Sequence, residues 1–239
     1  MHKHLKRLAA PKALRLERKT AKWTMKPSPG PHPADKSIPL GLILRDYLGM
    51  CDTRSEAKKI IGKGKVLVDS VARKDIKFPC GFMDVISIPD MKKDYRLLFD
   101  QRGKLTLVPI SKKEQGWKLC RIENKTILKS GRTQLNLHDG RNILVDKDSY
   151  KTGDVVKLSF SDGKITDVYP FDKGTVAFVT GGTHIGKIAT INSVQITRSS
   201  KPNIVLLKSK DSEFSTIKDY VFPVGKDSPV ITLPEVKMK

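Results

Sequence analysis

The segment from Gly181 to Lys187 contains the residue types of a phosphate-binding loop. Its glycines and lysine satisfy the pattern G-x-x-x-x-G-K, in which backbone N–H groups and the lysine hold the phosphates of a nucleotide. That chemistry also needs Ser or Thr directly after the lysine, to bind magnesium, and a helix that starts there. Position 188 is Ile, and the β-branched residues up to Ile191 indicate a strand. We therefore expect a strand, a tight glycine turn and a second strand, and no nucleoside triphosphate site.

A second set of residues that could bind phosphate is the basic residues between Arg54 and Lys63. Ala57, Ile60 and Ile61 fall on one side of a helix at about 100° per residue, which turns the charged residues between them to the other side. This charged face fits either an ordinary solvated surface or a surface that binds a polyanion. Its polar and basic members are Arg54, Ser55, Lys58, Lys59 and Lys63.

The cysteines and histidines do not follow a metal-binding pattern. Cys51, Cys80 and Cys120 are widely spaced, form no C-x-x-C pair and have no histidine at zinc-finger spacing. The five histidines are scattered along the chain. We therefore expect reduced, buried thiols in an intracellular protein, with no metal and no cofactor.

The charge balance points to a polyanionic partner. The sequence has 46 Lys and Arg against 25 Asp and Glu, a formal net charge of +21. Nucleic acid is the first candidate, because no apolar run approaches the roughly 18 residues that span a bilayer. The basic start of the chain lacks the apolar core of a signal peptide, and it is poor in the serine typical of a transit peptide.

The elements that position the basic face lie between Pro39 and Ile88. Residues 39–49 carry the apolar stripe of a half-buried helix, and Thr53-Arg-Ser-Glu56 is a capping box that starts a second helix ending near Gly62. Short strands are expected after it, with Val66 and Val68 pointing inward. They are Lys65–Ser70, Val71–Lys77 and Asp84–Ile88.

The order of these signals resembles the S-four RNA-binding module of ribosomal proteins, pseudouridine synthases and some tRNA synthetases. The match runs from Arg54 through Gly64 to Asp84-Val85-Ile86. In that family the second helix and the loop after it lie on RNA. The resemblance therefore implies phosphate contacts from six residues, whereas the first helix offers only Arg45. The six are Arg54, Ser55, Lys58, Lys59, Lys63 and Lys65.

Residues 1–36 are basic and rich in proline, and they predict an extended arm that buries too little to fold alone. Its cations suit the neutralisation of RNA phosphates. Trp23 could stack on an unpaired base, or it could pack the arm onto the body of the protein. The candidate RNA-binding residues of the arm are Lys3, Lys6, Arg7, Lys12, Arg15, Arg18, Lys19, Lys22, Trp23 and Lys26.

The region from 96 to 172 predicts short strands separated by turns about ten residues apart, which is typical of a small β-barrel or sandwich. We expect this region to be a rigid spacer with one side facing RNA. The expected strands are Leu105–Ile110, Trp117–Ile122, Thr133–Leu137, Asn142–Val145, Val155–Phe160 and Lys164–Val168.

In the region from 173 to 239 the strand, glycine turn and strand resemble the KOW motif of SH3-like barrels in ribosomal proteins and transcription elongation factors. The resemblance implies that Gly182, Thr183, His184 and Lys187 contact RNA, although the glycines could serve only to make a tight hairpin. Further strands are expected at Asn203–Leu207 and Tyr220–Val224.

We therefore expect a mostly β, multidomain α+β protein with four parts. These are a basic arm (1–36), an S-four module (37–95), a central β domain (96–172) and an SH3-like KOW domain with the C-terminal tail (173–239). Together they resemble the small-subunit ribosomal protein family S-four-e of archaea and eukaryotes. The resemblance implies a non-enzymatic, monomeric constituent of the cytoplasmic small ribosomal subunit that contacts its rRNA and neighbouring proteins and supports assembly and translation.

Two other classes fit less of the sequence. A pseudouridine synthase would need a buried Asp nucleophile in a large catalytic domain, whereas Asp139, Asp154 and Asp162 stand in turn-forming positions. A transcription factor that used the KOW hairpin to hold polymerase would leave the S-four module without a role.

Overall fold

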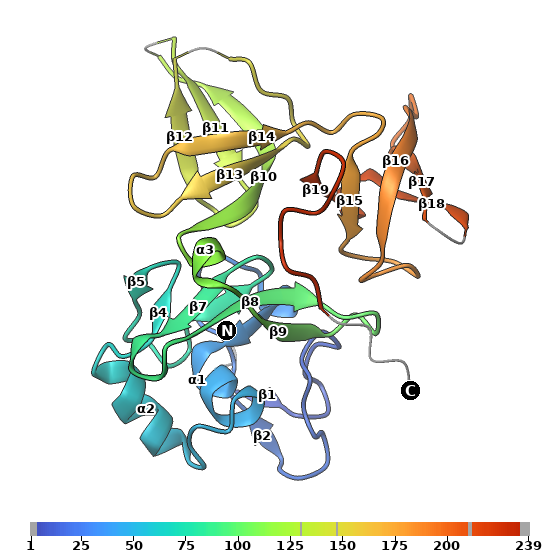
Figure 1. The fold of residues 1–239 in the computed structure, drawn as a ribbon. Helices are drawn as coiled ribbons and strands as arrows, with labels where there is room; N and C mark the ends of the chain where they lie inside the picture. The colour runs from blue at the N-terminus through green and yellow to red at the C-terminus, as the bar shows by residue number, and fades with distance from the viewer. Residues whose placement is uncertain (1–3, 130, 147, 210–211, 235–239) are drawn as a thin grey trace. The chain divides into compact units, whose positions relative to one another are not determined.

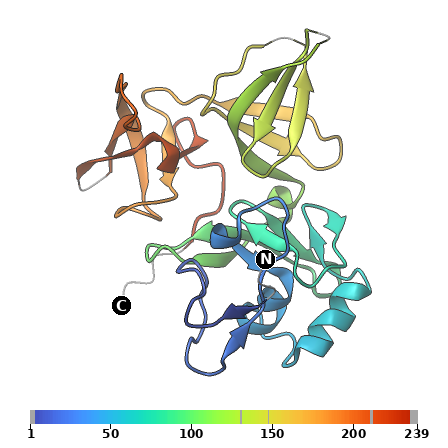
Figure 2. The same ribbon diagram turned by 180° about the vertical axis from the view of Figure 1, so that it is seen from behind.

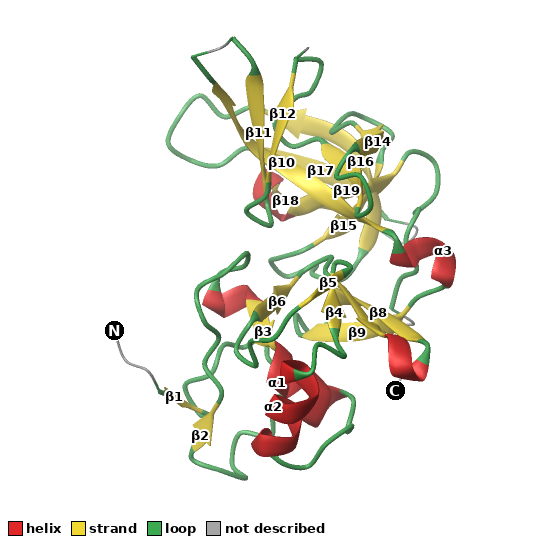
Figure 3. Ribbon diagram, turned by 90° about the vertical axis from the view of Figure 1, so that its left-hand side faces the viewer, coloured by secondary structure: helices red, strands yellow, loops and turns green. Residues whose placement is uncertain are grey.

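The computed structural model describes residues 4–129, 131–146, 148–209 and 212–234. The chain forms two compact units, one made of Met1–Asp100 and Lys104–Lys118, the other of Gln101–Gly103 and Leu119–Lys239. Strands make up most of the regular structure in both, as expected (Figures 1 and 3). Among the described residues, no helix has the length and apolar character needed to cross a membrane.

Short helices and small strand pairs form one half of the first unit. The strand β1 pairs with β2, and β3 pairs with β6, both antiparallel. Their bounds, with those of the helices, are β1 (Leu5–Lys6), β2 (Trp23–Thr24), η1 (Ala34–Lys36), β3 (Ser37–Pro39), α1 (Leu40–Leu42), the π-helix η2 (Ile43–Tyr47), α2 (Arg54–Gly62) and β6 (Pro79–Gly81).

The expected first helix is therefore α1 continued by η2. Its apolar stripe is buried as the sequence predicts, because Leu40, Ile43 and Leu44 have no exposed surface. Across from it, Ala57 and Ile61 of α2 are also fully buried. These side chains form the core on which α2 rests.

A five-stranded sheet forms the other half of this unit, in the order β5-β4-β7-β8-β9. Val66 and Val68 are buried, as predicted. The elements of this half are β4 (Leu67–Val68), β5 (Val71–Ala72), β7 (Val85–Ile88), η3 (Pro89–Met91), β8 (Lys93–Phe99), β9 (Leu105–Pro109) and α3 (Lys112–Gln115).

The strand β9 corrects the domain boundary predicted at residues 95 and 96. It pairs antiparallel with β8, with Phe99 opposite Leu105, so the sheet of the first unit extends through it. The predicted boundary falls inside β8 itself. The local pattern at Leu105–Ile110 correctly indicated a strand, but a strand's own residues do not specify which neighbour it pairs with.

The N-terminal segment packs against the module and is not a free extended arm (Figure 2, dark blue). Leu14 is 1% exposed, and Met25 and His32 are also buried. The backbone is attached at two points, where Leu105 N–H donates to Ala13 O and Ser28 N–H donates to Lys77 O, each at 2.9 Å. Although the segment has few apolar residues, Leu14 and Met25 belong to the buried core of the first unit.

The second unit contains two five-stranded sheets. The first has the order β12-β11-β10-β13-β14 and encloses a core that includes Cys120, Leu135 and Val156. Four of its strands lie where the sequence predicts them, and β10 is longer than predicted. Their bounds are β10 (Trp117–Ile127), β11 (Thr133–Leu137), β12 (Asn142–Val145), β13 (Val155–Ser159) and β14 (Ile165–Tyr169).

The second sheet has the order β18-β17-β16-β15-β19. Its core includes Ala177, Ile191 and Val205. Strand β18 was not predicted from the sequence, and its residues are exposed or only partly buried. The elements are β15 (Val176–Val179), β16 (Ile188–Gln195), β17 (Ile204–Lys208), β18 (Glu213–Ile217), η4 (Lys218–Tyr220) and β19 (Val221–Gly225).

Candidate nucleic-acid interface

Helix α2 begins with the capping box that the sequence predicts. Thr53 Oγ1 accepts a hydrogen bond from Glu56 N–H at 3.2 Å, and the Glu56 carboxylate accepts from Thr53 N–H at 3.4 Å and Asp52 N–H at 3.1 Å. These bonds lower the pKa of Glu56, the one from Asp52 most. The caps fix the start of the helix, and burial of Ala57 and Ile61 fixes its rotation.

The outer face of α2 is a row of accessible cations. Within the described part of the chain, Lys58, Lys59 and Lys63 form no ion pair. Cations without a carboxylate partner, spaced along one helix face, are suited to the neutralisation of successive phosphates. The exposed residues of this face, here called the α2 face, are Arg54, Ser55, Lys58, Lys59 and Lys63.

Two predicted contacts at the edge of this face have acidic partners. Lys65 Nζ lies 2.6 Å from Asp90 Oδ2, although both side chains are about half exposed. Arg45 makes a forked pair with its neighbour Asp46, with Nε to Oδ1 at 2.7 Å and Nη2 to Oδ2 at 3.0 Å. The Asp46 hydrogen bonds raise the pKa of Arg45. Arg45 is therefore less available to RNA than the α2 face.

Trp23 lies next to the α2 face. It is 50% exposed and forms part of the wall of a pocket of about 550 Å³. Its ring lies 5.5 Å from the His4 ring, and Lys22 Nζ is 5.4 Å from its centre. The structure thus brings residues of the arm and of the module together in one pocket, here called the Trp23 pocket. Its lining residues are His4, Leu5, Trp23, Thr24, Met25, Lys26, Arg54 and Lys77.

His4 and Lys77 also belong to this site, although neither was predicted from the sequence. Lys77 is visible in the sequence as one more cation after Val71, but only the backbone bond between Ser28 and Lys77 brings it beside the arm. Its charge could have made it a candidate from the sequence. Its position beside the arm could not have been predicted, because that position depends on a contact between distant residues.

Two arginines of the arm are used inside the fold. Arg18 donates to the backbone oxygens of Ala10 at 2.7 Å and Pro11 at 3.0 Å. Arg7 is 8% exposed and donates to Glu17 O and to the Thr20 hydroxyl. Both side chains therefore hold the loops of the segment together.

The other cations predicted in the arm differ in their exposure. Lys3 lies outside the described residues. Lys26 is half-buried in the wall of the Trp23 pocket. The exposed members are Lys6, Lys12, Arg15, Lys19 and Lys22.

A buried cluster of charged side chains joins distant parts of the first unit. Lys118 Nζ lies 2.6 Å from Asp69 Oδ2 and 3.0 Å from Asp84 Oδ1, and His32 Nε2 lies 3.0 Å from the other Asp84 oxygen. Burial disfavours the charged form of Asp84, but Lys118 and His32 outweigh it and hold the pKa of this carboxyl well below its usual value. Burial and the charge of Asp84 raise the pKa of Asp69. The cluster ties the N-terminal segment, β7 and the start of β10 together.

The glycine loop in the second unit has the predicted strand–turn–strand form. Gly182 and Gly186 have φ of +79° and +78°, a conformation that favours glycine. Gly181 is packed against Tyr220, since a Cβ there would lie 2.6 Å from the ring. At Gly181 the absence of a side chain therefore serves internal packing.

The loop presents its polar residues at one end of the sheet. Thr183 and Lys187 are exposed. The half-buried His184 ring lies 4.1 Å from the Phe214 ring, and Lys187 Nζ lies 5.9 Å from the same ring. Phe214, on the unpredicted strand β18, thus supports two of the four residues of this loop that were predicted to contact RNA.

One cluster resembles a metal site in composition only. Cys120, His138 and Asp139 place potential ligand atoms within 4.8 Å of one another. Asp139 already pairs with Arg141 at 3.3 Å, and His138 Nδ1 accepts from Arg121 N–H at 3.2 Å. Ordinary hydrogen bonds and ion pairs account for the arrangement.

The α2 face with the Trp23 pocket and the glycine loop of the second unit are two surfaces suited to an RNA backbone and bases. Together they define a basic protein of the RNA-binding class. Family models support this class. A model of the S4 domain matches residues 43–86, the Ribosomal family S4e model matches residues 91–165, and the RS4NT domain model matches residues 1–35.

Known proteins resemble the chain over nearly its whole length. Small ribosomal subunit protein eS4 of Methanothermobacter thermautotrophicus is 52% identical, over 97% of this chain and 96% of that protein. The protein of the same name from Methanocaldococcus jannaschii is 48% identical, over 97% of each. The crystal structure of 30S ribosomal protein S4e from Thermoplasma acidophilum superposes with a TM-score of 0.70 at 36% identity, covering 80% of this chain and 96% of that one.

The chain therefore belongs to the ribosomal protein family S4e. This confirms the family expected from the sequence. The family is one of ribosomal proteins and not of enzymes, which agrees with the expectation that the chain catalyses no reaction.

Proposed function

We propose that this protein is a structural constituent of the small ribosomal subunit in the cytoplasm, where it binds rRNA and supports subunit assembly and translation. The observation that carries the proposal is the α2 face, whose helix is fixed by a buried core. Its Lys58, Lys59 and Lys63 are exposed and form no ion pair with any residue that the structure describes. The names of the relatives at 52% and 48% identity support the same assignment.

Within this function, the α2 face contacts phosphates and the Trp23 pocket receives an unpaired base. A half-exposed tryptophan with Lys26, Arg54 and Lys77 around it combines stacking and charge, the two terms that bind single-stranded RNA. The exposed arm cations extend the contact. Arg7 and Arg18 contribute by holding the arm in shape.

The second unit contributes a separate contact. The glycine loop acts as a KOW motif in an SH3-like domain, and Thr183, His184 and Lys187 touch rRNA beside Gly182. Phe214 and Tyr220 support the loop, so its backbone is already ordered before it binds. The central β domain acts as a spacer, with neighbouring ribosomal proteins as further partners and no self-association.

Co-sedimentation tests this proposal. The native protein should travel with the small subunit through a gradient at moderate salt and leave it at high salt. Protein found only at the top of the gradient, or with the large subunit, would contradict the assignment.

A further inference from the structure

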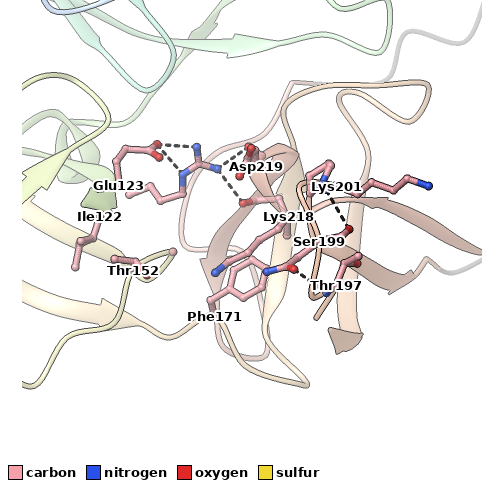
Figure 4. Close-up of a pocket in the computed structure, with 14 residues that line it drawn as sticks. Ile122, Glu123, Thr152, Phe171, Thr197, Ser199, Lys201, Lys218 and Asp219 are labelled. Atoms are coloured by element: carbon pink, nitrogen blue, oxygen red, sulfur yellow. Dashed lines mark hydrogen bonds and ion pairs between the residues drawn. The ribbon is translucent and has the colours of Figure 1, made fainter. Parts of the chain in front are cut away.

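The second unit contains a polar pocket of about 480 Å³ that the roles above do not use (Figure 4). It lies where the 152–153 turn and the start of the central sheet meet Phe171, the loop 197–203 and η4. Its volume is within the range of roughly 300 to 1,000 Å³ that is usual for pockets that bind small molecules.

One wall of this pocket is rigid. The Arg121 guanidinium donates from Nε and Nη2 to Glu123 Oε1 at 2.9 and 2.6 Å, and from Nη1 to Asp219 O at 2.7 Å. This arginine therefore links the central sheet to η4, and its charge is already balanced by Glu123. It shapes the pocket and leaves ligand binding to other cations.

Lys218 supplies a cation to the pocket. It is half-buried, and its Nζ lies 5.4 Å from the centre of the Phe171 ring. Room for it depends on Gly153, where φ is +99° and a Cβ would approach Lys218 Cε to 3.3 Å. Among the described residues Lys218 makes no ion pair. A partly desolvated ammonium without a carboxylate is stabilised when an anion binds beside it.

The loop 197–203 supplies hydroxyl groups to the pocket. Asn203 holds the loop in place, since its Oδ1 accepts from Thr197 N–H at 3.0 Å and its backbone oxygen accepts from Lys218 N–H at 2.9 Å. Ser199 and Lys201 lie on this loop and are exposed. Figure 4 shows the Lys201 side chain extending away from Lys218, so the hydroxyl groups of this loop are suited to a sugar and Lys218 to the phosphate beside it.

We propose that this pocket binds one unpaired nucleotide of RNA, with its phosphate beside Lys218. The inference rests on the proposed function and adds a third RNA contact to it. A duplex keeps its nucleotides stacked and paired, so only a nucleotide displaced from a helix enters a pocket of this size. The phosphate could also come from a free nucleotide, and the binding experiment separates the two sources.

The first test compares the full-length Lys218→Gln protein with a Lys226→Gln control, which removes the same charge from an exposed lysine outside the pocket. Fluorescence anisotropy measures the binding of a labelled, unstructured ten-nucleotide RNA and of a labelled duplex of equal length. Binding of AMP is measured by its competition, unlabelled, with the single-stranded RNA. Lys218→Gln should weaken single-strand binding about fivefold to tenfold and reduce its salt slope by about 0.7, the share of one phosphate. Lys226→Gln should change it by less than about twofold.

Equal weakening in the two variants would overturn the proposal. So would weakening seen only for the duplex, or competition by AMP as strong as that by the oligonucleotide. If the unmodified protein fails to bind any RNA, the proposed function fails first, and this distinguishes the two results.

Crosslinking in the intact small subunit provides a second readout. Ultraviolet irradiation and mass spectrometry should find a nucleotide attached to the peptide with Phe171 or to the peptide with Ser199. Chemical crosslinking that joins lysine amines to carboxylates is carried out in parallel. Crosslinks from Lys201 and Lys218 to carboxylates of a neighbouring protein, without RNA adducts, would assign the pocket to a protein partner and refute the inference.

Discussion

At Asp84, a histidine and a lysine from distant parts of the chain meet one buried carboxylate. The residue is 1% exposed, and its oxygens lie 3.0 Å from His32 Nε2 and 3.0 Å from Lys118 Nζ. A buried ion pair adds little net stability over an apolar replacement, but removing one partner leaves a buried charge uncompensated. The order of the first unit therefore depends on this carboxylate keeping its charge.

Asp84→Asn should lower the free energy of unfolding at neutral pH by about 3 kcal/mol, because Lys118 loses one of its two carboxylates. In the unmodified protein the pKa of Asp84 is depressed in the folded state. The stability it contributes is therefore present above about pH 4 and is lost as the pH falls toward the folded pKa. Urea unfolding between pH 3 and 7 measures both effects.

The control is Asp148→Asn, which removes the exposed partner of Lys125 and should cost less than about 1 kcal/mol. If Asp84→Asn is no more costly than this control, the cluster does not have the structural role assigned to it.

In the second unit, the close packing of Gly181 against Tyr220 can be tested by a single substitution. Gly181→Ala would place a methyl group 2.6 Å from the Tyr220 ring and should destabilise the protein by about 1 to 3 kcal/mol. Gly116→Ala is the matched control, since nothing lies within 4 Å of a Cβ there. Thermal melting compares the two. If the Gly181 cost persists in a Tyr220→Ala background, the ring is not its cause.

Among the secondary-structure elements, α2 has its start fixed by local sequence and its orientation fixed by tertiary packing. Its capping box comes from four consecutive residues, 53–56, whereas burial of Ala57 and Ile61 turns its cations outward. Because the cations take no part in the core, stability and RNA binding are separable on this helix.

Replacing Lys58, Lys59 and Lys63 together with Gln should leave the melting temperature nearly unchanged. It should reduce the slope of log affinity against log salt by about 2 to 3 units, at about 0.7 to 0.9 for each phosphate that is no longer neutralised. Filter binding to small-subunit rRNA at several salt concentrations measures the slope. A lower melting temperature with an unchanged slope would instead make these lysines structural.

At the scale of the whole molecule, the N-terminal segment is part of the folded body. Leu14, Met25 and His32 are buried in it, and its backbone bonds reach β9 and Lys77. Deletion of residues 1–33 should therefore lower the free energy of unfolding by roughly 3 kcal/mol or more, since it exposes core and removes one partner of Asp84.

A charge variant serves as the control for this deletion. Lys6, Lys12 and Lys19 are exposed, and replacing all three with Gln should weaken rRNA binding while leaving the unfolding curve in place. Differential scanning calorimetry with parallel binding assays makes the comparison. A deleted protein that melts as the full chain does would show that the segment is dispensable for folding.

The residues alone determined what depends on short stretches of chain. Thr53 to Glu56 specified the start of α2, the β-branched runs specified most strands, and Gly182 and Gly186 specified a turn that needs positive φ. The excess of cations indicated a polyanionic partner before any contact was known. These features follow from neighbours a few residues apart, so the local pattern is sufficient to predict them.

Only the tertiary structure decided which distant residues meet. It paired β9 with β8, brought Trp23 beside Arg54, and placed Lys118 between Asp69 and Asp84. It also used Arg7 and Arg18 internally, although their charge is indistinguishable in the sequence from that of the exposed lysines. Partner choice depends on which apolar surfaces are buried together across the whole chain, and no short window of residues contains that information.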